Sequence, residues 1–583
     1  MLTLNKKLKS YELQPDLSKF QHLFLSKFNG DPTCFYNIQP RLNNAIEDLL
    51  KYSTATIPVM LVKCAEHVDY LSMIANSARQ KTSEKILLGG HYHIQEDTII
   101  LQPARSIKDN FSSNGEIIYS EWSTPEQLFG CVRIFKHQIT LEPGLVHRAN
   151  GGVLILALRA LLDQPKIWFR IKEILIQKRF DWLSLTKTPL PVSIPSMPLY
   201  FKLILTGERE LLDEFREMEH KLASICIYSE FEEELEVLNE ENVLMWCQWV
   251  TQIALKTNKP RITADFWPVL FQAAARYTGN QQFLPLCPVW IEMQLGSSVQ
   301  YGTSSELNGE SLQRALLTRE WQLNYLAARL RESILLGQTI IQTEGKVIGQ
   351  INGLSVIEIP GYPSLLGEPL RISCVVHNGD GELMDVERKV DLGGNIHSKG
   401  MIIIQSWLIA ALELDSHLPF SISLVFEQTY LRIDGDSASL AGLCAIISAL
   451  SCQPIDQQIA VTGSVDQFGN VQSIGCINEK IEGFFQICNQ RKLTGSQGVI
   501  IPRTNLSNLC LQRDVIEAVH NGKFNIWIVN HVNDAIPLLT GMKWNADNEP
   551  GLLQKIKDRI TKINTSKIFK RKRWFLPWKK WLK

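Results

Sequence analysis

Ser437 stands where a strand-like segment gives way to a helix-like one, a position from which a serine can do chemistry. Residues 424–430 before it are rich in β-branched and aromatic side chains, which favour strands. After it, apolar residues recur at helical spacing from Leu440 to Leu450, and Asp436 is of a type that caps helix starts. Because the unpaired N–H groups of a helix start favour negative charge, a serine there can attack a carbonyl while those groups stabilise the oxyanion.

A serine nucleophile needs a base, and Lys480 is the candidate further along the chain. It falls in the first turns of a second predicted helix, which begins near Asn478 just after Gly475. A lysine is normally protonated, with a pKa of about 10.4, but burial lowers that value and can make it a general base. Most lysines near a helix start are solvated surface residues, and Asp-Gly-Asp-Ser is a common turn composition. Residue chemistry alone therefore leaves a structural explanation open for both features.

The segment Asp-Gly-Asp-Ser-Ala-Ser at residues 434–439 resembles the nucleophile motif of the Lon protease family, in the LonB-type variant with Asp before the Ser. Two positions depart from the family pattern: Cys476 stands where the family often has a second Gly, and Asn478 where many members carry Lys. Other segments resemble family blocks in order and spacing: residues 347–354, 426–428, 461–465, 469–475 and 478–480.

This resemblance implies a role for each polar residue of the site. Ser437 is the expected nucleophile and Lys480 the general base, and Thr462 is expected to line the site and support the lysine. Asp434 and Asp436 flank the nucleophile, where they either tune Lys480 by their charge or cap the helix. Neither departure from the family pattern alters the expected dyad.

A block ahead of the protease-like segment resembles the AAA+ module fused to LonB-type proteases, on residues 126–130 and 143–156. The predicted strand 57–64 stands where a P-loop nucleoside triphosphatase would carry Gly-x-x-x-x-Gly-Lys-Ser/Thr. The loop that follows, residues 64–70, has no Gly and no Lys, and its two carboxylates would repel phosphate. We therefore expect no phosphate cradle at this junction.

The other parts of a nucleotide site are also missing from the sequence. Ala157 occupies the position of the acidic residue expected after the predicted strand 153–156, so a magnesium ligand is absent. Residues 275–279 resemble part of the sensor helix, but the arginine expected a few residues later does not occur in 283–288. We expect a retained α/β scaffold with no cofactor, neither ATP nor Mg²⁺. The alternative left open is an ATP-dependent protease with an unrecognised nucleotide site.

The resemblance and the hydrophobic pattern together predict four regions. The fold class is an α+β Lon proteolytic domain preceded by a degenerate α/β AAA+-like module with a helical lid. Within the proteolytic domain we expect paired strands at 371–377 and 384–390, a long helix at 397–414, and buried strands at 498–502 and 524–529. The expected boundaries are 1–238 for the AAA+-like module, 239–338 for the lid, 339–545 for the proteolytic domain and 546–583 for a tail.

Composition places the chain in an ordinary soluble class. Its 583 residues are 45% hydrophobic and 21% charged, and Lys plus Arg balance Asp plus Glu at 60 each, so no specific nucleic-acid partner is expected. No Cys-x-x-Cys pair occurs, and we expect no metal site. The chain starts without an apolar leader segment and contains no apolar run of about 18 residues, so we expect a cytoplasmic location.

The final residues, 567–583, contain eight Lys or Arg among aromatic residues and no acid. This composition suits a solubilising tail, an anionic membrane surface that would place the protein at the periphery of the inner membrane, or nucleic acid. The resemblance predicts a Lon-like serine endopeptidase that acts on unfolded polypeptides and assembles as a homo-hexamer. A non-catalytic ring scaffold or adaptor with the same fold is the alternative from another functional class.

Overall fold

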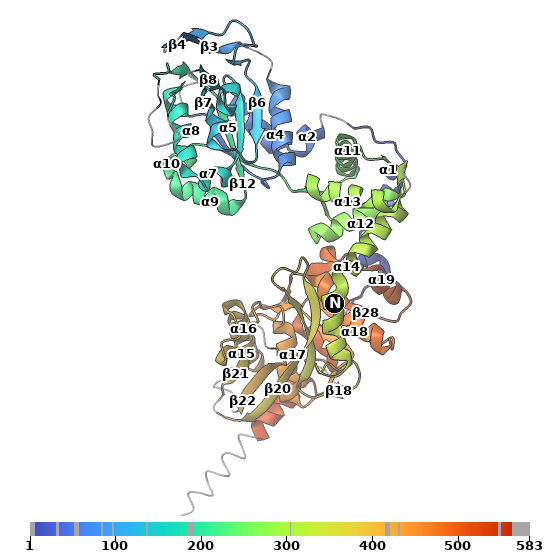
Figure 1. Cartoon of the computed structure of the whole chain (residues 1–583). Helices are drawn as coiled ribbons and strands as arrows, with labels where there is room; N and C mark the ends of the chain where they lie inside the picture. Colours follow the sequence, from blue (N-terminus) through green and yellow to red (C-terminus); the bar gives the residue numbers. More distant parts are fainter. Residues whose placement is uncertain are drawn as a thin grey trace, which may run out of the picture. The chain divides into compact units, whose positions relative to one another are not determined.

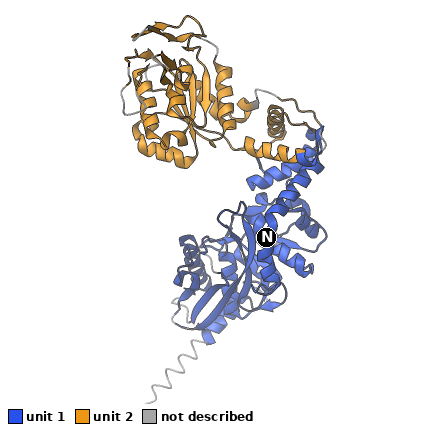
Figure 2. Ribbon diagram, viewed as in Figure 1, with its two compact units in different colours: residues 1–25, 263–284, 300–583 blue, residues 26–262, 285–299 orange. Residues whose placement is uncertain are grey.

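The computed structural model groups the chain into two compact units, and the chain passes between them more than once (Figure 1). Figure 2 shows the first unit, residues 1–25, 263–284 and 300–583, and the second, residues 26–262 and 285–299. Both units therefore contain parts of the predicted AAA+-like range and of the predicted lid. The structure describes residues 6–562 except 31–33, 52–56, 83–85, 96–97, 136–137, 184–189, 191, 303–304, 380, 414–419, 430–431 and 546–549.

The first unit is organised around a mixed eight-stranded sheet in the order β1-β28-β27-β24-β19-β20-β22-β21. The four strands from β28 to β19 run parallel, whereas β19, β20 and β22 pair antiparallel. This mixture confirms the α+β prediction for the proteolytic domain. The strand bounds are β1 Lys6–Lys7, β19 Gln350–Ile357, β20 Leu366–Asn378, β21 Leu383–Asp385, β22 Phe420–Glu427, β24 Ile459–Val461, β27 Gly498–Pro502 and β28 Asn525–Val529.

Three helices of this unit carry or surround the candidate catalytic residues. They are α16 (Asn395–Leu412), α17 (Ser439–Ser451) and α18 (Ile477–Arg491). Every residue of α17 is buried, because this helix lies in the middle of the main hydrophobic core, against β19 and β20. Its continuous run of small and apolar residues is what full burial of a helix requires.

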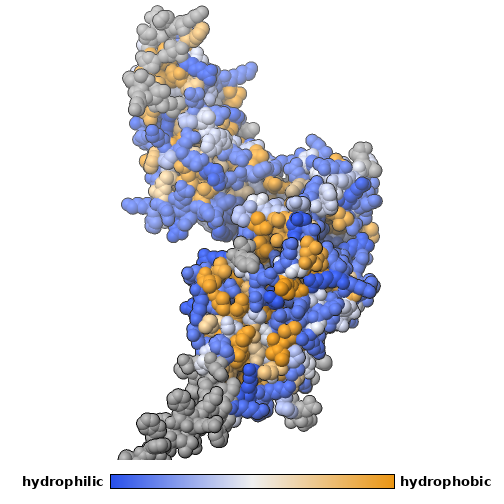
Figure 3. Space-filling model, turned by 60° about the horizontal axis from the view of Figure 1, so that its bottom comes forward, coloured by the Kyte–Doolittle hydropathy of each residue, from blue (hydrophilic) through white to orange (hydrophobic). Residues whose placement is uncertain are grey.

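The unit also exposes apolar side chains on its surface, seen as separate orange patches in the space-filling view (Figure 3). Exposed apolar residues of this unit include Val375, Ile396, Ile402 and Phe468. Single exposed apolar residues are normal in soluble proteins, so these patches do not by themselves indicate a binding surface.

Two sequence predictions for this unit were wrong. Residues 384–390 were expected to form a strand paired with 371–377, but β21 ends at Asp385, pairs with β22, and is followed by helix α15 (Val386–Lys389). The N-terminal residues were expected to belong to the AAA+-like module, but β1 pairs with β28, and Leu8 and Leu13 lie in a hydrophobic core of the first unit. Strand pairing depends on partners far away in sequence, so local patterns do not reveal it. The expected strands at 498–502 and 524–529 are confirmed.

The second unit contains a five-stranded parallel sheet in the order β13-β2-β12-β9-β6. Its central strands are continuous apolar runs, as expected for strands buried on both faces. Helices α4 (Val68–Lys81), α7 (Leu158–Leu162) and α9 (Arg209–Met218) pack on it. The strand bounds are β2 Val59–Lys63, β6 Ile117–Ser120, β9 Val153–Ala157, β12 Lys202–Gly207 and β13 Ile227–Glu230.

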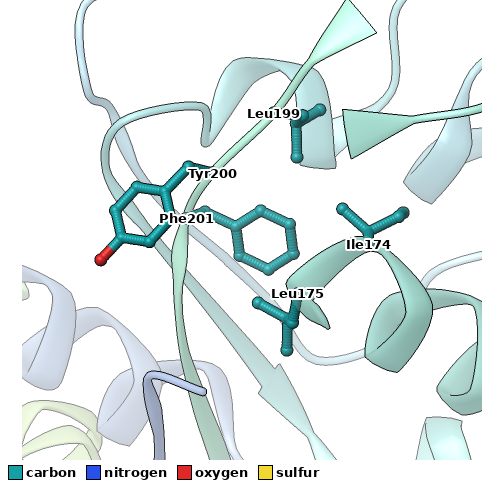
Figure 4. Close-up of a pocket in the computed structure, with 5 residues that line it drawn as sticks. All are labelled: Ile174, Leu175, Leu199, Tyr200 and Phe201. Atoms are coloured by element: carbon teal, nitrogen blue, oxygen red, sulfur yellow. The ribbon is translucent and has the colours of Figure 1, made fainter. Parts of the chain in front are cut away.

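An apolar gap in this unit separates helix α8 (Pro165–Gln177) from the segment before β12. Ile174 and Leu175 of α8 face Leu199 and Phe201, while the hydroxyl of Tyr200 points away from them (Figure 4). With only aliphatic and aromatic side chains facing inward, this gap is part of the core packing and not a candidate catalytic site.

The predicted helical region contains α11 (Glu240–Lys256), α12 (Phe266–Thr278), α13 (Pro288–Tyr301) and α14 (Gly309–Leu335). Helices α12 and α14 pack on each other and belong to the first unit, together with the eight-stranded sheet. Among the described residues, no helix is both long enough and apolar enough to cross a membrane. The basic segment 567–583 lies outside the described residues.

Candidate active site

Ser437 and Lys480 meet where two helices begin. Ser437 lies two residues before α17, and Lys480 is in the first turn of α18. The Nζ atom of Lys480 donates a hydrogen bond to Ser437 Oγ at 2.9 Å, and the lysine is only 3% exposed. When the amine is neutral, the same separation allows it to accept the hydroxyl proton. The structure therefore brings together the two residues that the sequence suggested as nucleophile and base.

Burial is the main influence on the amine of Lys480. It lowers the pKa of Lys480 to about 8, against smaller opposing effects from Cys476, Asp436 and Glu479. A group with a pKa of about 8 is neutral in roughly a tenth of molecules at pH 7. The site thus supplies a useful fraction of free amine without requiring strongly alkaline conditions.

Thr462 acts on the main chain of the nucleophile. Its hydroxyl is completely buried and donates to the carbonyl oxygen of Ser437 at 3.2 Å. The backbone N–H of Gly463 donates to the same carbonyl at 2.8 Å, and Leu440 N–H donates back to Gly463 O at 3.1 Å. Thr462 was expected to support the lysine, but its hydrogen bond fixes the backbone of the serine instead.

The two aspartates hold the nucleophile loop to its surroundings. Helix α17 begins only at Ser439, so Asp436 is not its cap; its carboxylate accepts a hydrogen bond from Ser464 Oγ at 2.7 Å. Asp434 accepts from the backbone N–H of Ile396 at 3.2 Å and thereby caps α16, a different helix from the one expected. The charge of Asp436 raises the pKa of Lys480, which supports the prediction that this aspartate influences the lysine.

Helix α16 packs its first turns directly against the nucleophile loop, a contact that the sequence does not predict. A Cβ atom added to Gly394 would lie 2.4 Å from the carboxylate of Asp434, and one added to Gly400 would lie 3.1 Å from Asp436 Cβ. The buried His397 lies on this helix, with its Nε2 atom 3.1 Å from a carboxylate oxygen of Asp385. The adjacent glycines 393 and 394 were the available sequence signal for this close approach.

The backbone conformation at Cys476 explains why the family often has a glycine at this position. Cys476 precedes α18 with φ of +56°, in the left-handed region that glycine adopts most easily. The frequent glycine at this position of the family therefore suits the turn, and cysteine occupies it at some conformational cost. The carbonyl of Cys476 accepts the N–H of Lys480 at 3.2 Å, so this turn helps to place the lysine.

In the second unit, charged side chains gather where the parallel strands end. Glu66, after β2, accepts hydrogen bonds from the N–H of Arg159 at 2.9 Å and from its Nε atom at 3.2 Å. Lys63 lies 3.6 Å from Glu208 and 3.4 Å from Glu233, which follow β12 and β13. Nucleotides bind at this edge of open α/β sheets, but here carboxylates already neutralise the cations. Among the described residues, no group of three or more His, Cys, Asp or Glu is placed to hold a metal ion.

Comparison with known proteins agrees with this architecture. Residues 334–540 match the Lon protease (S16) C-terminal proteolytic domain, and residues 113–228 match the LonB-like AAA domain. The chain is 49% identical to a putative Lon protease homolog of Escherichia coli over 98% of both chains. It belongs to the Lon protease family. A putative Lon protease homolog of Haemophilus influenzae is 41% identical over 91% of this chain and 88% of that protein.

More distant Lon proteins resemble a smaller part of the chain. The archaeal Lon protease of Pyrococcus abyssi is 26% identical, over 65% of this chain and 37% of its own length. The S16 match contains Ser437, Thr462 and Lys480, which identifies the unit around the eight-stranded sheet as the Lon proteolytic domain and supports a serine peptidase.

Proposed function

We propose that this Lon-family protein is a serine endopeptidase in which Ser437 is the nucleophile and Lys480 the general base. The hydrogen bond of 2.9 Å between a half-buried serine and a buried lysine is the observation that supports this proposal most directly. Burial provides the neutral amine that base catalysis needs. The segment 462–465 and the first turns of α16 hold the serine in place from two sides.

The proposed reaction is an acyl transfer in two stages. Ser437 Oγ attacks the peptide carbonyl carbon while Lys480 Nζ takes the hydroxyl proton, and the tetrahedral intermediate breaks when Lys480 returns that proton to the leaving amine. This leaves an acyl ester on Ser437. Lys480 then takes a proton from a water molecule that attacks the ester, and returns this proton to Ser437 Oγ as the carboxylic acid product leaves, which restores the free serine and the neutral amine.

We further propose that peptide hydrolysis proceeds without ATP hydrolysis. The segment after β2 lacks the glycines and lysine of a phosphate loop, and Ala157 ends β9 where a magnesium ligand is expected. Lys63 and Arg159 are each paired with glutamates at the same sheet edge. An ATP-dependent protease with an unrecognised site remains the alternative, and a nucleotide-binding titration separates the two.

Unfolded polypeptides are the proposed substrates. Ile396, whose N–H donates to Asp434, is 52% exposed, and Phe468, in the turn just after Val465, is 79% exposed. The exposed side chain of Ile396, next to the nucleophile loop, suits substrate segments that are themselves apolar and extended. By resemblance to the family we propose a cytoplasmic homo-hexamer, with the basic segment 567–583 as an attachment to anionic membrane surfaces.

The deciding experiment is digestion of casein by the purified full-length protein, with and without ATP and Mg²⁺. We expect cleavage in both conditions at the same rate, and none by Ser437→Ala. Ser496→Ala, in an exposed loop before β27, serves as the matched control and should cleave normally. If the wild-type protein is inert towards casein and peptides across the whole pH range, the non-catalytic scaffold becomes the better explanation.

A test of the membrane attachment uses the same protein. Deleting residues 567–583 should abolish sedimentation with vesicles of anionic lipid while leaving casein cleavage in solution intact. Equal sedimentation of the full-length and shortened proteins would contradict the attachment.

A further inference from the structure

A buried ion pair joins α12 to the helix that carries Lys480. Both terminal nitrogens of Arg276, on α12, donate to the two carboxylate oxygens of Glu482 on α18, each at 2.7 Å. Arg276 also donates to the carbonyl of Cys510 at 2.9 Å, and Glu482 accepts the N–H of Gln512 at 2.9 Å. Such a bidentate pair fixes direction as well as distance. Burial raises the pKa of Glu482, and the guanidinium of Arg276 lowers it. Burial has the larger effect, so the pKa lies above its ordinary value.

Side-chain amides reinforce this junction at the start of α18. Asn478 accepts the N–H of Cys510 at 2.8 Å and donates to the carbonyl of Asn508 at 2.9 Å. Asn508 in turn donates to the carbonyl of Gly279, directly after α12, at 3.0 Å. The position at which many family members carry Lys is thus used here for a bond that ties α18, through residues 508–510, to the end of α12.

The ion pair matters for Lys480 because Lys480 and Glu482 leave α18 on nearly opposite sides of the helix. A helix turns by about 100° per residue, so Glu482, two positions after Lys480, points to a nearly opposite side of the helix. Lys480 reaches Ser437 from one side while Glu482 reaches Arg276 from the other. The rotation of α18 about its axis therefore sets both contacts at once.

Another contact of α18, with the start of β20, sets how closely the helix approaches the sheet. The helix lies backbone against backbone on the start of β20: a Cβ atom at Gly367 would lie 1.7 Å from Glu479 O, and one at Gly483 would lie 2.2 Å from Gly367 O. Glycines at a contact permit close approach, but they offer no side chain to resist turning. The buried apolar side chains of α18, Ile481 and Phe484 among them, resist turning by packing in the core, and the Arg276–Glu482 pair adds a directional contact on the side opposite Lys480.

We propose that Arg276 is a positioning residue for peptide hydrolysis: by binding Glu482 it holds α18 at the rotation that points Lys480 at Ser437. This rests on the proposed function of the dyad. In the chain, α12 is flanked on both sides by segments of the second unit, residues 26–262 and 285–299. The AAA-containing part of the chain is therefore connected, through α12, to the side chain that orients the base.

The test compares full-length Arg276→Gln with a matched control on the same helix. Arg491 lies at the other end of α18 and donates to the carbonyl of Ile341 at 2.7 Å and of Ile334 at 3.1 Å. Arg491→Gln therefore also weakens the anchoring of α18, but 11 residues, or about 16 Å, away from Lys480. Both variants are assayed for kcat and KM with a fluorogenic peptide, for labelling of Ser437 by a phosphonofluoridate, and for Tm.

We expect Arg276→Gln to lower kcat and the labelling rate by about tenfold or more, with KM within twofold of wild type. The pH midpoint of kcat should rise, because a turned Lys480 meets more water while Asp436, Cys476 and Glu479 still surround it. Arg491→Gln should keep kcat and the midpoint within twofold and 0.3 pH units of wild type, roughly the precision of such assays. Arg276→Gln combined with Glu482→Gln should recover most of kcat, because a neutral amide pair removes the unpaired buried charge.

Two results would overturn the proposal. One is wild-type kcat, labelling and pH midpoint in Arg276→Gln. The other is an equal loss of kcat in both arginine variants at equal loss of Tm, which would mean general weakening of the fold. Failure of the underlying function is recognised separately, because Ser437→Ala would then cleave as fast as the wild-type protein.

Discussion

Two lysines in this molecule show how their neighbours decide what an amine can do. Lys480, in the Lon proteolytic domain, is buried next to a serine hydroxyl, and burial lowers its pKa to about 8. Lys63, at the sheet edge of the other unit, lies within 3.6 Å of Glu208 and 3.4 Å of Glu233. A buried amine without a paired carboxylate can lose its proton and act as a base. An ammonium group between two carboxylates stays protonated, but its charge is balanced by them, so it attracts a phosphate only weakly.

The two sites therefore differ in more than their motifs. The protease site keeps its polar groups in hydrogen bonds that leave the serine and the amine facing each other. At the sheet edge, Lys63 and Arg159 are instead paired with the carboxylates of Glu233 and Glu66. Changes to the proposed dyad, to its support and to the nucleotide supply test this difference.

Removing either member of the dyad should have the largest effect. Ser437→Ala and Lys480→Ala should each reduce kcat/KM for a fluorogenic peptide by roughly 10³-fold or more, because the reaction loses its nucleophile or its base. Lys480→Arg should not restore activity, because a guanidinium stays protonated at any working pH. Size-exclusion profiles check that assembly is unchanged. Wild-type cleavage by Ser437→Ala would place the nucleophile elsewhere.

The pH dependence should reveal the neutral form of Lys480. Since its pKa is lowered to about 8, kcat should rise close to tenfold per pH unit below that value and level off above about pH 9. The measurement is an initial-rate profile from pH 5 to 10, with far-UV circular dichroism to confirm folding. A profile that is flat between pH 6 and 9 would argue against a lysine base.

Burial of Lys480 should lower the free energy of unfolding, and an apolar residue at this position should raise it again. Because its pKa is about 8 when folded and 10.5 when exposed, the unfolded chain binds more protons between these values. The cost is full below pH 8 and fades as the pH rises towards 10.5. Lys480→Met should therefore stabilise the fold by about 1–3 kcal/mol at pH 7 and by little at pH 10.5, measured by thermal unfolding. A pH-independent difference would contradict this account.

Thr462→Val should have a smaller effect than any change in the dyad. It removes one neutral hydrogen bond to the carbonyl of Ser437, worth about 0.5–1.5 kcal/mol, but keeps the shape of the side chain. This corresponds to roughly a 2–12-fold loss of kcat. Because Gly463 still donates to the same carbonyl, the loop should stay in place. A loss as large as that of Ser437→Ala would mean that Thr462 takes part in the chemistry.

ATP should have no effect at all. Calorimetric titration with ATP and Mg²⁺ should show no binding in the micromolar range, and ATP should leave the rate of casein cleavage unchanged, because residues 64–70 lack the phosphate-loop pattern and Lys63 is paired with glutamates. Micromolar binding would show that a nucleotide site exists outside the recognised pattern.

The residue types of the proposed dyad and most of the regular elements follow from the amino-acid sequence alone. The order of strand, Ser437, helix, strand and Lys480 was readable because helical spacing and strand composition are properties of neighbouring residues. The same holds for the short strands β27 and β28, each of which forms where its apolar run predicted it. The missing phosphate loop was likewise visible, since it is a pattern of adjacent residues.

How these segments are brought together depends on the tertiary structure. Asp434 caps α16 and not α17, β1 joins a strand more than five hundred residues away, and Arg276 reaches Glu482 across 206 positions. The lowered pKa of Lys480 likewise comes from its burial, to which residues distant in sequence contribute. The physical reason is the same in each case: a helix hydrogen-bonds within four residues, whereas strand pairing, burial and ion pairs depend on which distant segments the fold brings together.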